Sequence, residues 1–374
     1  MKSKLLKSVF FPILLFLVPF LLSSCSKSPN VINIGVVGPF TGEGATYGAA
    51  MKRGIELALD EVNSTGGILN KKVIATYEDD RLTQKDGINA INKLINANNV
   101  QAIIGSAASK VTLAIAPFAE KAHVVLISSI STADTIKYSG DYIFRDVPPN
   151  KQQGITAAKF VYDVLGKTNA AVFYKNDDYG ISLSSAFISA FKALGGKILI
   201  VDSYAPDATD FRDQLIKIKS KNPDVIFFPG NYQESGIILR QGKELRIKSI
   251  FVGGDGSYSP ELIKIAGIAA DGSYYTLMSL PPDTAKSFLN FKAAYYKKYN
   301  ETPDVYSVYS YDAAMVILKA IEKAGEYNGE KIKDELYKID YHGVTGDIKF
   351  DSYGEVNKDY SVYLVKNGSF VLYK

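Results

Sequence analysis

The order of strand and helix patterns is the feature that most limits the fold of this chain. A β-branched run at residues 31–37 is followed by a loop, by apolar residues at helical spacing over residues 47–62, by Gly66-Gly67 and by another apolar run at residues 72–77. The same succession of strand, loop, helix, Gly-Gly and strand recurs over residues 169–201. Strands that alternate with amphipathic helices indicate a parallel sheet with helices on both faces. The repetition predicts an α/β fold with two doubly wound lobes rather than one large sheet.

Further segments continue the alternation in both halves of the chain. Strands are expected at residues 100–104, 124–127, 225–228 and 250–252, and helices at residues 86–96, 112–121, 180–194, 210–220 and 234–245. Two late helices, at residues 285–299 and 311–324, have no strand between them, so we expect them to return to the first lobe. The chain therefore crosses between the lobes more than once, and Pro148-Pro149 is typical of one connecting segment.

The N-terminal segment has the features of an export signal. Three lysines precede an apolar run at residues 9–22, and the motif Leu22-Ser23-Ser24-Cys25 resembles the lipobox of bacterial lipoproteins, in which the cysteine is acylated. A membrane-spanning helix needs about 20 apolar residues, whereas this run is shorter and contains two prolines. We therefore predict a signal peptide at residues 1–24, lipidation at Cys25 and a short tether over residues 25–30. The protein would then be anchored to a membrane of the cell envelope, facing the periplasm or the cell exterior.

Charge and composition argue against several classes of function. The signal carries three of the 43 basic residues, against 39 acidic ones, so the mature chain is nearly neutral and lacks the concentrated basic face that nucleic acid requires. Neither His123, before a buried strand, nor His342, in a predicted loop, has a partner at metal-ligand spacing. Glycines at positions 42, 44 and 48 and Gly166-Lys167-Thr168 match nucleotide-binding loops only in part. We expect no enzymatic activity, no metal and no cofactor.

Five short segments along the mature chain form an ordered set. They are IGVVGPFTG at residues 34–42, EVNSTGGI at residues 61–68, YEDD at residues 77–80, DYG at residues 178–180 and GVTGDIKFD at residues 343–351. This set resembles the branched-chain amino-acid binding proteins, the type I periplasmic-binding family. The resemblance covers essentially the whole mature chain and implies two α/β lobes joined by three crossovers. It implies a first lobe of residues 31–148 plus 279–354, and a second lobe of residues 149–278 plus 355–374.

The same resemblance implies a function. It indicates the solute-binding component of an ABC importer, a monomer that closes its lobes on a branched-chain or similar aliphatic amino acid and delivers it to the membrane permease. A ligand-sensing receptor for signalling is the alternative, since the same fold serves that purpose.

Ligands of doubly wound sheets bind beyond the carboxyl ends of the strands, so the loops there are candidate site segments. These loops are residues 41–47, 106–112, 128–132, 175–179, 229–233 and 253–257. By resemblance, Ser109, Thr132 and the backbone of Ile130 bind the α-carboxylate of the ligand and share its α-ammonium, although hydroxyls at such places also cap helices. Asp255 matches the acidic residue that pairs with the α-ammonium, and the alternative is an ordinary Asp-Gly turn.

The side-chain end of the pocket is less defined. Tyr47 and Tyr179 match aromatic positions that line the cleft from opposite lobes. Asn231 falls where some relatives have an aromatic residue, with Tyr232 beside it, and Asp255 stands where the family often has glutamate. These departures leave small polar amino acids and amides open as ligands. We expect the ligand to bind the first lobe and to be clamped by Tyr179 and Asp255 as the lobes close.

Overall fold

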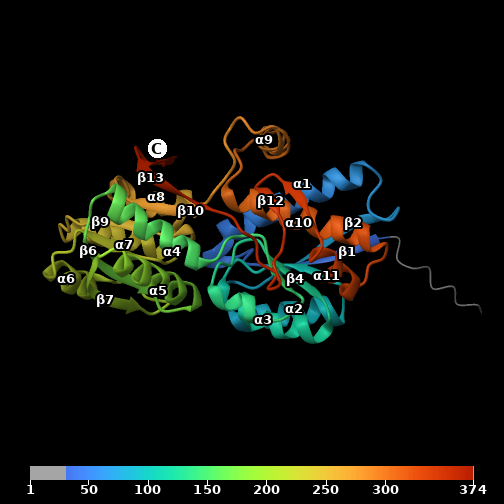
Figure 1. Cartoon of the computed structure of the whole chain (residues 1–374), viewed down its shortest axis with the longest axis horizontal. Helices are drawn as coiled ribbons and strands as arrows, with labels where there is room; N and C mark the ends of the chain where they lie inside the picture. Colours follow the sequence, from blue (N-terminus) through green and yellow to red (C-terminus); the bar gives the residue numbers. More distant parts are fainter. Residues whose placement is uncertain (1–30, 374) are drawn as a thin grey trace, which may run out of the picture. The chain divides into compact units, whose positions relative to one another are not determined.

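Two sheets organise the chain, and each is flanked by helices (Figure 1). The structure is a computed structural model that describes residues 31–373, and these residues belong to one unit. The predicted signal peptide, the lipidation site Cys25 and the tether lie outside the described residues. Among the described residues, no helix is both long enough and apolar enough to cross a membrane.

The first sheet has five parallel strands in the order β2-β1-β3-β4-β5. Its strands are β1 (Val31–Gly38), β2 (Lys72–Asp79), β3 (Ala102–Ile104), β4 (Val125–Ser128) and β5 (Ile143–Arg145). The connecting helices are α1 (Ala45–Ser64), α2 (Gln84–Asn96) and α3 (Ser109–Ala122). The central strands are buried on both faces, which explains why they are continuous apolar runs without alternation. We call the part of the chain built on this sheet the first lobe.

The second sheet has seven strands in the order β14-β13-β10-β9-β8-β6-β7. Five are parallel: β6 (Asn169–Lys175), β7 (Lys197–Tyr204), β8 (Val225–Phe227), β9 (Ile250–Gly253) and β10 (Tyr274–Met278). The C-terminal strands β13 (Tyr360–Lys366) and β14 (Ser369–Leu372) add an antiparallel edge that the alternation did not predict. The helices are α4 (Asn150–Lys159), continued by the π-helical turn η3 (Phe160–Val164), α5 (Asp178–Ala193), α6 (Arg212–Ser220), α7 (Tyr232–Glu244) and α8 (Pro260–Ala266). This part of the chain is the second lobe.

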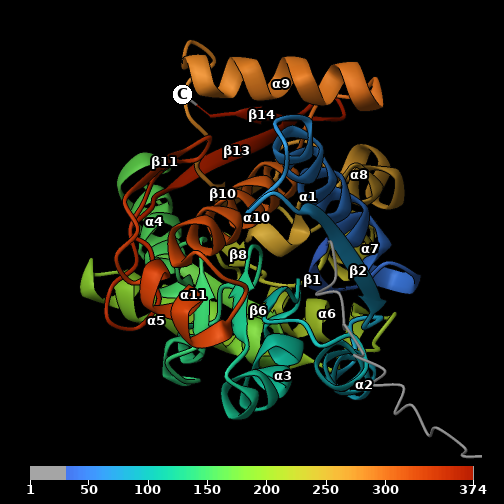
Figure 2. The same cartoon turned by 90° about the vertical axis from the view of Figure 1, so that its right-hand side faces the viewer.

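Three late helices pack on the first lobe; this return was predicted for the first two, and the third helix was not predicted. They are α9 (Lys286–Tyr299), α10 (Val305–Ala324) and α11 (Gly329–Leu336). Figure 2 shows α10 beside α1, and the two backbones approach so closely that a Cβ on Gly54 would lie 2.1 Å from the carbonyl oxygen of Ser307. The prediction for α10 was wrong at its start, because the helix begins at Val305 rather than at residue 311. This helix is buried on nearly all sides and therefore lacks the one-sided apolar stripe that marks a surface helix.

Short elements account for the other departures. His342 was expected in a loop but lies on β11 (Tyr341–Gly343), which pairs with β12 (Gly346–Ile348) in a small hairpin. Three-residue strands carry too few residues for a periodic pattern, so they are not separable from loops by sequence. Short 3₁₀ turns also stand beside the main elements: η1 (Gly42–Gly44), η2 (Asp134–Tyr138), η4 (Asp255–Ser257) and η5 (Gly267–Ala269).

Three segments connect the two sheets, and we call them the crossover segments: residues 146–149, 279–285 and 349–359. Buried polar contacts hold them together. Arg145, which is buried, forms an ion pair with Glu355 of the third segment. Tyr360 Oη donates to the carbonyl oxygen of Pro148 at 2.8 Å, and Tyr309 Oη donates to that of Ser279 at 2.9 Å. The backbone amide of Ser279 donates to the carbonyl oxygen of Asp359 at 2.9 Å, so the third segment contacts both of the others.

Candidate ligand-binding site

Loops from both lobes line one small cavity of about 40 Å³. They follow the carboxyl ends of the parallel strands, where sheets of this kind place their sites. The lining residues are Tyr47, Leu82, Ala107, Ala108, Ser109, Lys110, Ile130, Thr132, Asp177, Tyr179, Asn231, Asp255, Gly256 and Tyr306. Seven of the eight predicted ligand-binding residues are in this set, and the exception is Tyr232.

The first lobe contributes a wall of hydroxyl groups. Ser109 is the first residue of α3, and its Oγ accepts a hydrogen bond from the amide of Ala133 at 3.2 Å. Thr132 is 1% exposed, and its Oγ1 has no hydrogen-bond partner among the residues that the structure describes. A buried hydroxyl without a partner carries a free-energy cost, which a ligand acceptor or donor removes. Together with the positive end of α3, this wall suits a carboxylate.

The second lobe contributes a buried carboxylate. Asp255 lies just after β9 and is 2% exposed. Tyr179 Oη donates to Asp255 Oδ1 at 2.8 Å and accepts from the amide of Gly256 at 3.1 Å, so the ring is oriented at both sides. Burial raises the pKa of Asp255 to about 6, although the hydrogen bond from Tyr179 acts in the opposite direction. An ionised Asp255 in this cavity therefore favours a cationic partner.

Tyrosines from the first lobe close the cavity against the second. Tyr47 Oη donates to the carbonyl oxygen of Gly256, and Tyr306 Oη donates to that of Asp255. The two rings meet edge to face with centroids 5.4 Å apart. Burial raises the pKa of both tyrosines well above the usual value, so both hydroxyls remain protonated donors.

Tyr232 lies outside the cavity lining although it was predicted to contact the ligand. Its ring packs edge to face on Tyr47 with centroids 5.1 Å apart. Its hydroxyl donates to the carbonyl oxygen of Glu43 at 2.5 Å. Asn231, the N-cap residue of α7, lines the cavity in its place.

Seven lining residues were not predicted individually. Five of them fall inside the predicted site loops: Ala107, Ala108, Lys110, Asp177 and Gly256. Leu82 and Tyr306 fall outside these loops. Leu82 follows β2 in a left-handed turn with φ of 59°, where a bulky residue is unusual, and that unusual placement is visible only in the structure. Tyr306 was missed because the start of α10 was placed too late.

The chemistry of this set is that of a binding site. Carboxylate, hydroxyl, amide and aromatic groups surround a cavity that is closed by both lobes. No group of three or more His, Cys, Asp or Glu side chains suited to a metal occurs in the part of the chain that the structure describes.

Known proteins share both the sequence pattern and the fold. The model of the periplasmic binding protein family matches residues 31–369. The chain belongs to this family. The predicted resemblance and the α/β fold with two parallel-sheet lobes are thereby confirmed. One relative is the leucine-, isoleucine-, valine-, threonine- and alanine-binding protein of Pseudomonas aeruginosa, which is 28% identical over 344 residues, 91% of each chain. Another is the Leu/Ile/Val-binding protein BraC3 of Rhizobium johnstonii, which is 30% identical over 86% of this chain and 90% of the relative.

Two solved structures of this periplasmic binding protein family give the same picture. The leucine-binding protein LivK of Thermotoga maritima is 34% identical, with a TM-score of 0.87 over 92% of this chain and 98% of that one. The branched-chain amino acid transporter substrate-binding protein LivJ of Streptococcus pneumoniae, solved in complex with isoleucine, is 30% identical with a TM-score of 0.85 over 91% and 97% of the two chains.

Proposed function

We propose that this protein binds a branched-chain or similar aliphatic α-amino acid between its lobes, as the solute-binding component of an ABC importer. The observation that carries the proposal is the pairing of two complementary groups in one cavity. Asp255 supplies a buried carboxylate from the second lobe. Thr132 of the first lobe supplies a buried hydroxyl that has no hydrogen-bond partner within residues 31–373. An α-amino acid presents an ammonium and a carboxylate on one carbon, which matches this arrangement. Relatives named for leucine, isoleucine and valine support the same ligand class.

The proposed roles follow from the polarity of each group. Thr132 Oγ1, Ser109 and the backbone of Ile130 bind the ligand carboxylate at the start of α3. Asp255, oriented by Tyr179, binds the ammonium. The two walls belong to different lobes, so one ligand completes its contacts only when both are near. Ligand binding thereby favours the closed arrangement over an open one.

Asp255 also explains why closure would depend on a ligand. Burial raises its pKa from 3.8 to about 6, so keeping it ionised in the closed cavity costs about 3 kcal/mol at pH 7. A ligand ammonium removes this cost by pairing with the carboxylate. A solute without a cationic group leaves the cost in place, which selects for amino acids over simple carboxylic acids.

Aliphatic and polar groups share the remaining wall. Leu82, Ala107, Ala108 and Ile130 offer apolar contacts, and these favour a branched aliphatic side chain. Asn231 adds an amide at the same cavity. A small polar amino acid or an amide would use that group, so both belong among the ligands tested.

The cellular context is part of the same proposal. Acylation of Cys25, which lies outside the described residues, would hold the protein on the outer side of a membrane. The protein, as a monomer with closed lobes, would then present the ligand to the permease and leave the ligand chemically unchanged. We also propose the lobe boundaries predicted from the sequence: residues 31–148 plus 279–354 for the first lobe, and residues 149–278 plus 355–374 for the second. Cys25→Ala in the full chain should release the protein from the membrane fraction, whereas Ser26→Ala should not.

Isothermal titration of residues 26–374 against the standard amino acids and their amides tests the ligand. We expect leucine, isoleucine or valine to bind most tightly, and Thr132→Ala to weaken binding about tenfold, since a hydrogen bond to a charged group is lost. Failure of every α-amino acid to bind would refute the ligand class. Tight binding of amides or polar amino acids alone would refute the aliphatic assignment.

A further inference from the structure

Tyr232 joins the two lobes without lining the cavity. It is the first residue of α7 in the second lobe and is 3% exposed. Its hydroxyl donates to the carbonyl oxygen of Glu43 at 2.5 Å and lies 3.4 Å from Thr46 Oγ1, which donates to it. Glu43 and Thr46 both belong to the first lobe, at the start of α1 and the turn before it. The polar contacts of the Tyr232 hydroxyl are therefore contacts between lobes.

Neighbouring groups reinforce the same junction. The Gln233 side-chain amide reaches the carbonyl oxygen of Glu43 at 3.4 Å. The amide of Tyr232 is 3.4 Å from Tyr47 Oη, and that hydroxyl in turn donates to Gly256. Tyr47 thus stands between the cavity on one side and Tyr232 on the other. The contact at Tyr232 holds Tyr47 against the second lobe.

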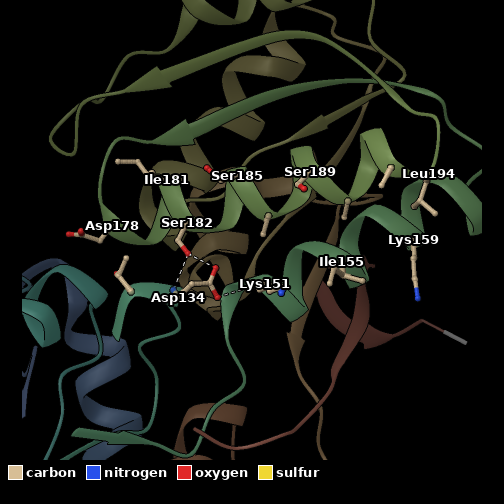
Figure 3. Close-up of a pocket in the computed structure, with 14 residues that line it drawn as sticks. Asp134, Lys151, Ile155, Lys159, Asp178, Ile181, Ser182, Ser185, Ser189 and Leu194 are labelled. Carbon is tan, nitrogen blue, oxygen red and sulfur yellow. Dashed lines mark hydrogen bonds between the residues drawn. The ribbon is translucent and has the colours of Figure 1, made fainter. Parts of the chain in front are cut away.

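Another contact between the lobes lies near the first crossover segment. Asp134 of η2 and Ser182 of α5 exchange hydrogen bonds of 3.1 and 3.0 Å (Figure 3). Asp134 also accepts from the backbone amide of Lys151 at 2.9 Å, two residues beyond the first crossover segment. The contact at Tyr232 includes no residue next to a crossover segment, since α7 lies between β8 and β9 and α1 follows β1.

We infer that Tyr232 is a positioning residue that latches the closed lobes together and raises the affinity for every ligand alike. The latch consists of the Tyr232 hydroxyl, the Glu43 carbonyl and Thr46. It forms on closure and breaks on opening, so its contribution enters the closing equilibrium rather than any ligand contact. This inference rests on the proposed function, because it assumes that closure accompanies binding.

Tyr232→Phe tests the latch, because it removes one hydroxyl and keeps the ring that packs on Tyr47. We expect the Kd for leucine, valine and alanine to rise by one common factor of about five, the value of one neutral hydrogen bond. The ligand dissociation rate should rise by a similar factor. Glu43→Gln is the matched control, since the latch uses the backbone carbonyl of Glu43 and not its side chain. Thr46→Val removes a latch contact on the first lobe and should raise the Kd for leucine, valine and alanine by one common factor.

Small-angle X-ray scattering of the unliganded full-length protein separates this inference from the ligand assignment. The latch predicts that Tyr232→Phe has a larger mean radius of gyration than wild type or Glu43→Gln, whichever ligand the protein takes. An unchanged radius together with unchanged Kd values overturns the latch. A change in the ratio of Kd values among ligands also overturns it, because that result makes Tyr232 a ligand contact. An equal loss of melting temperature with and without ligand would show a purely structural role and overturns it too.

Discussion

Replacing Asp255 by asparagine gives the sharpest prediction, because the substitution removes the charge and nearly preserves the shape. The carboxylate is buried and accepts a hydrogen bond from the Tyr179 hydroxyl at 2.8 Å. An amide oxygen still accepts that bond. A ligand ammonium in the variant would be buried beside a neutral group. Breaking a buried ion pair by removing one partner typically costs about 3–5 kcal/mol, so we expect binding to weaken about 100- to 5,000-fold.

Isothermal titration at pH 7.5 with wild type, Asp255→Asn and Asp177→Asn measures this effect. Asp177 is the matched control, because it is a second carboxylate that lines the same cavity and caps α5 through the amide of Gly180. Asparagine caps helices as well as aspartate does, so this variant should retain most of its affinity. Binding by Asp255→Asn within tenfold of wild type would refute the assignment of the ammonium to Asp255. An equal loss in the two variants would show that cavity charge in general, and not Asp255, controls the affinity.

Asp255→Asn should weaken ligand binding but should raise the stability of the unliganded protein at neutral pH. The pKa of Asp255 is raised from 3.8 to about 6, mainly by burial, so the closed state favours the protonated acid. The stabilisation that the protonated Asp255 side chain gives to the folded protein is complete below pH 4, and it is lost as the pH rises through 6. Asp255→Asn should therefore stabilise the unliganded protein at pH 7.5 and have little effect at pH 4. Thermal unfolding followed by circular dichroism at the two pH values measures the difference, and a variant that is less stable at pH 7.5 would contradict the argument.

Further predictions concern pH, a buried ion pair and helix packing. Ligand affinity should fall about tenfold for each pH unit below 6, because Asp255 must lose its proton to pair with an ammonium. Isothermal titrations in buffers of different ionisation enthalpy should report proton release near pH 6. Binding that does not depend on pH would contradict this prediction. Lys175→Met leaves Glu234 buried without its partner and should lower the free energy of unfolding by about 3–5 kcal/mol in urea titrations. The double variant Lys175→Met/Glu234→Leu should recover most of this loss. A double variant as unstable as the single one would refute the pairing argument. Gly54→Ala places a methyl group 2.1 Å from a backbone carbonyl oxygen of α10. It should lower the free energy of unfolding by about 1–3 kcal/mol in the same assay, despite the higher helix propensity of alanine. A more stable variant would contradict the close packing of α1 on α10.

Much of the candidate site was within reach of the sequence, because a loop that follows a parallel strand has a known place in the fold. Ser109, Thr132 and Asp255 lie in the segments that follow β3, β4 and β9. Local patterns predict those segments, and the family resemblance indicated these residues within them. Tyr306 could not be placed in this way. It lies on a helix that is buried on nearly all sides, and no periodic pattern marks which of its residues faces the cleft.

The sequence by itself determined the alternation of strands and helices, its duplication and the loops that carry the chemistry. Those properties are local, since hydrophobic period and turn residues act within a few positions of the chain. Only the tertiary structure decided which groups meet across the lobes. Tyr232 does not line the cavity, and its hydroxyl donates to a carbonyl oxygen 189 residues earlier in the chain. Asp255 has a raised pKa because segments distant in sequence exclude water from it, and desolvation of that kind depends on the whole fold.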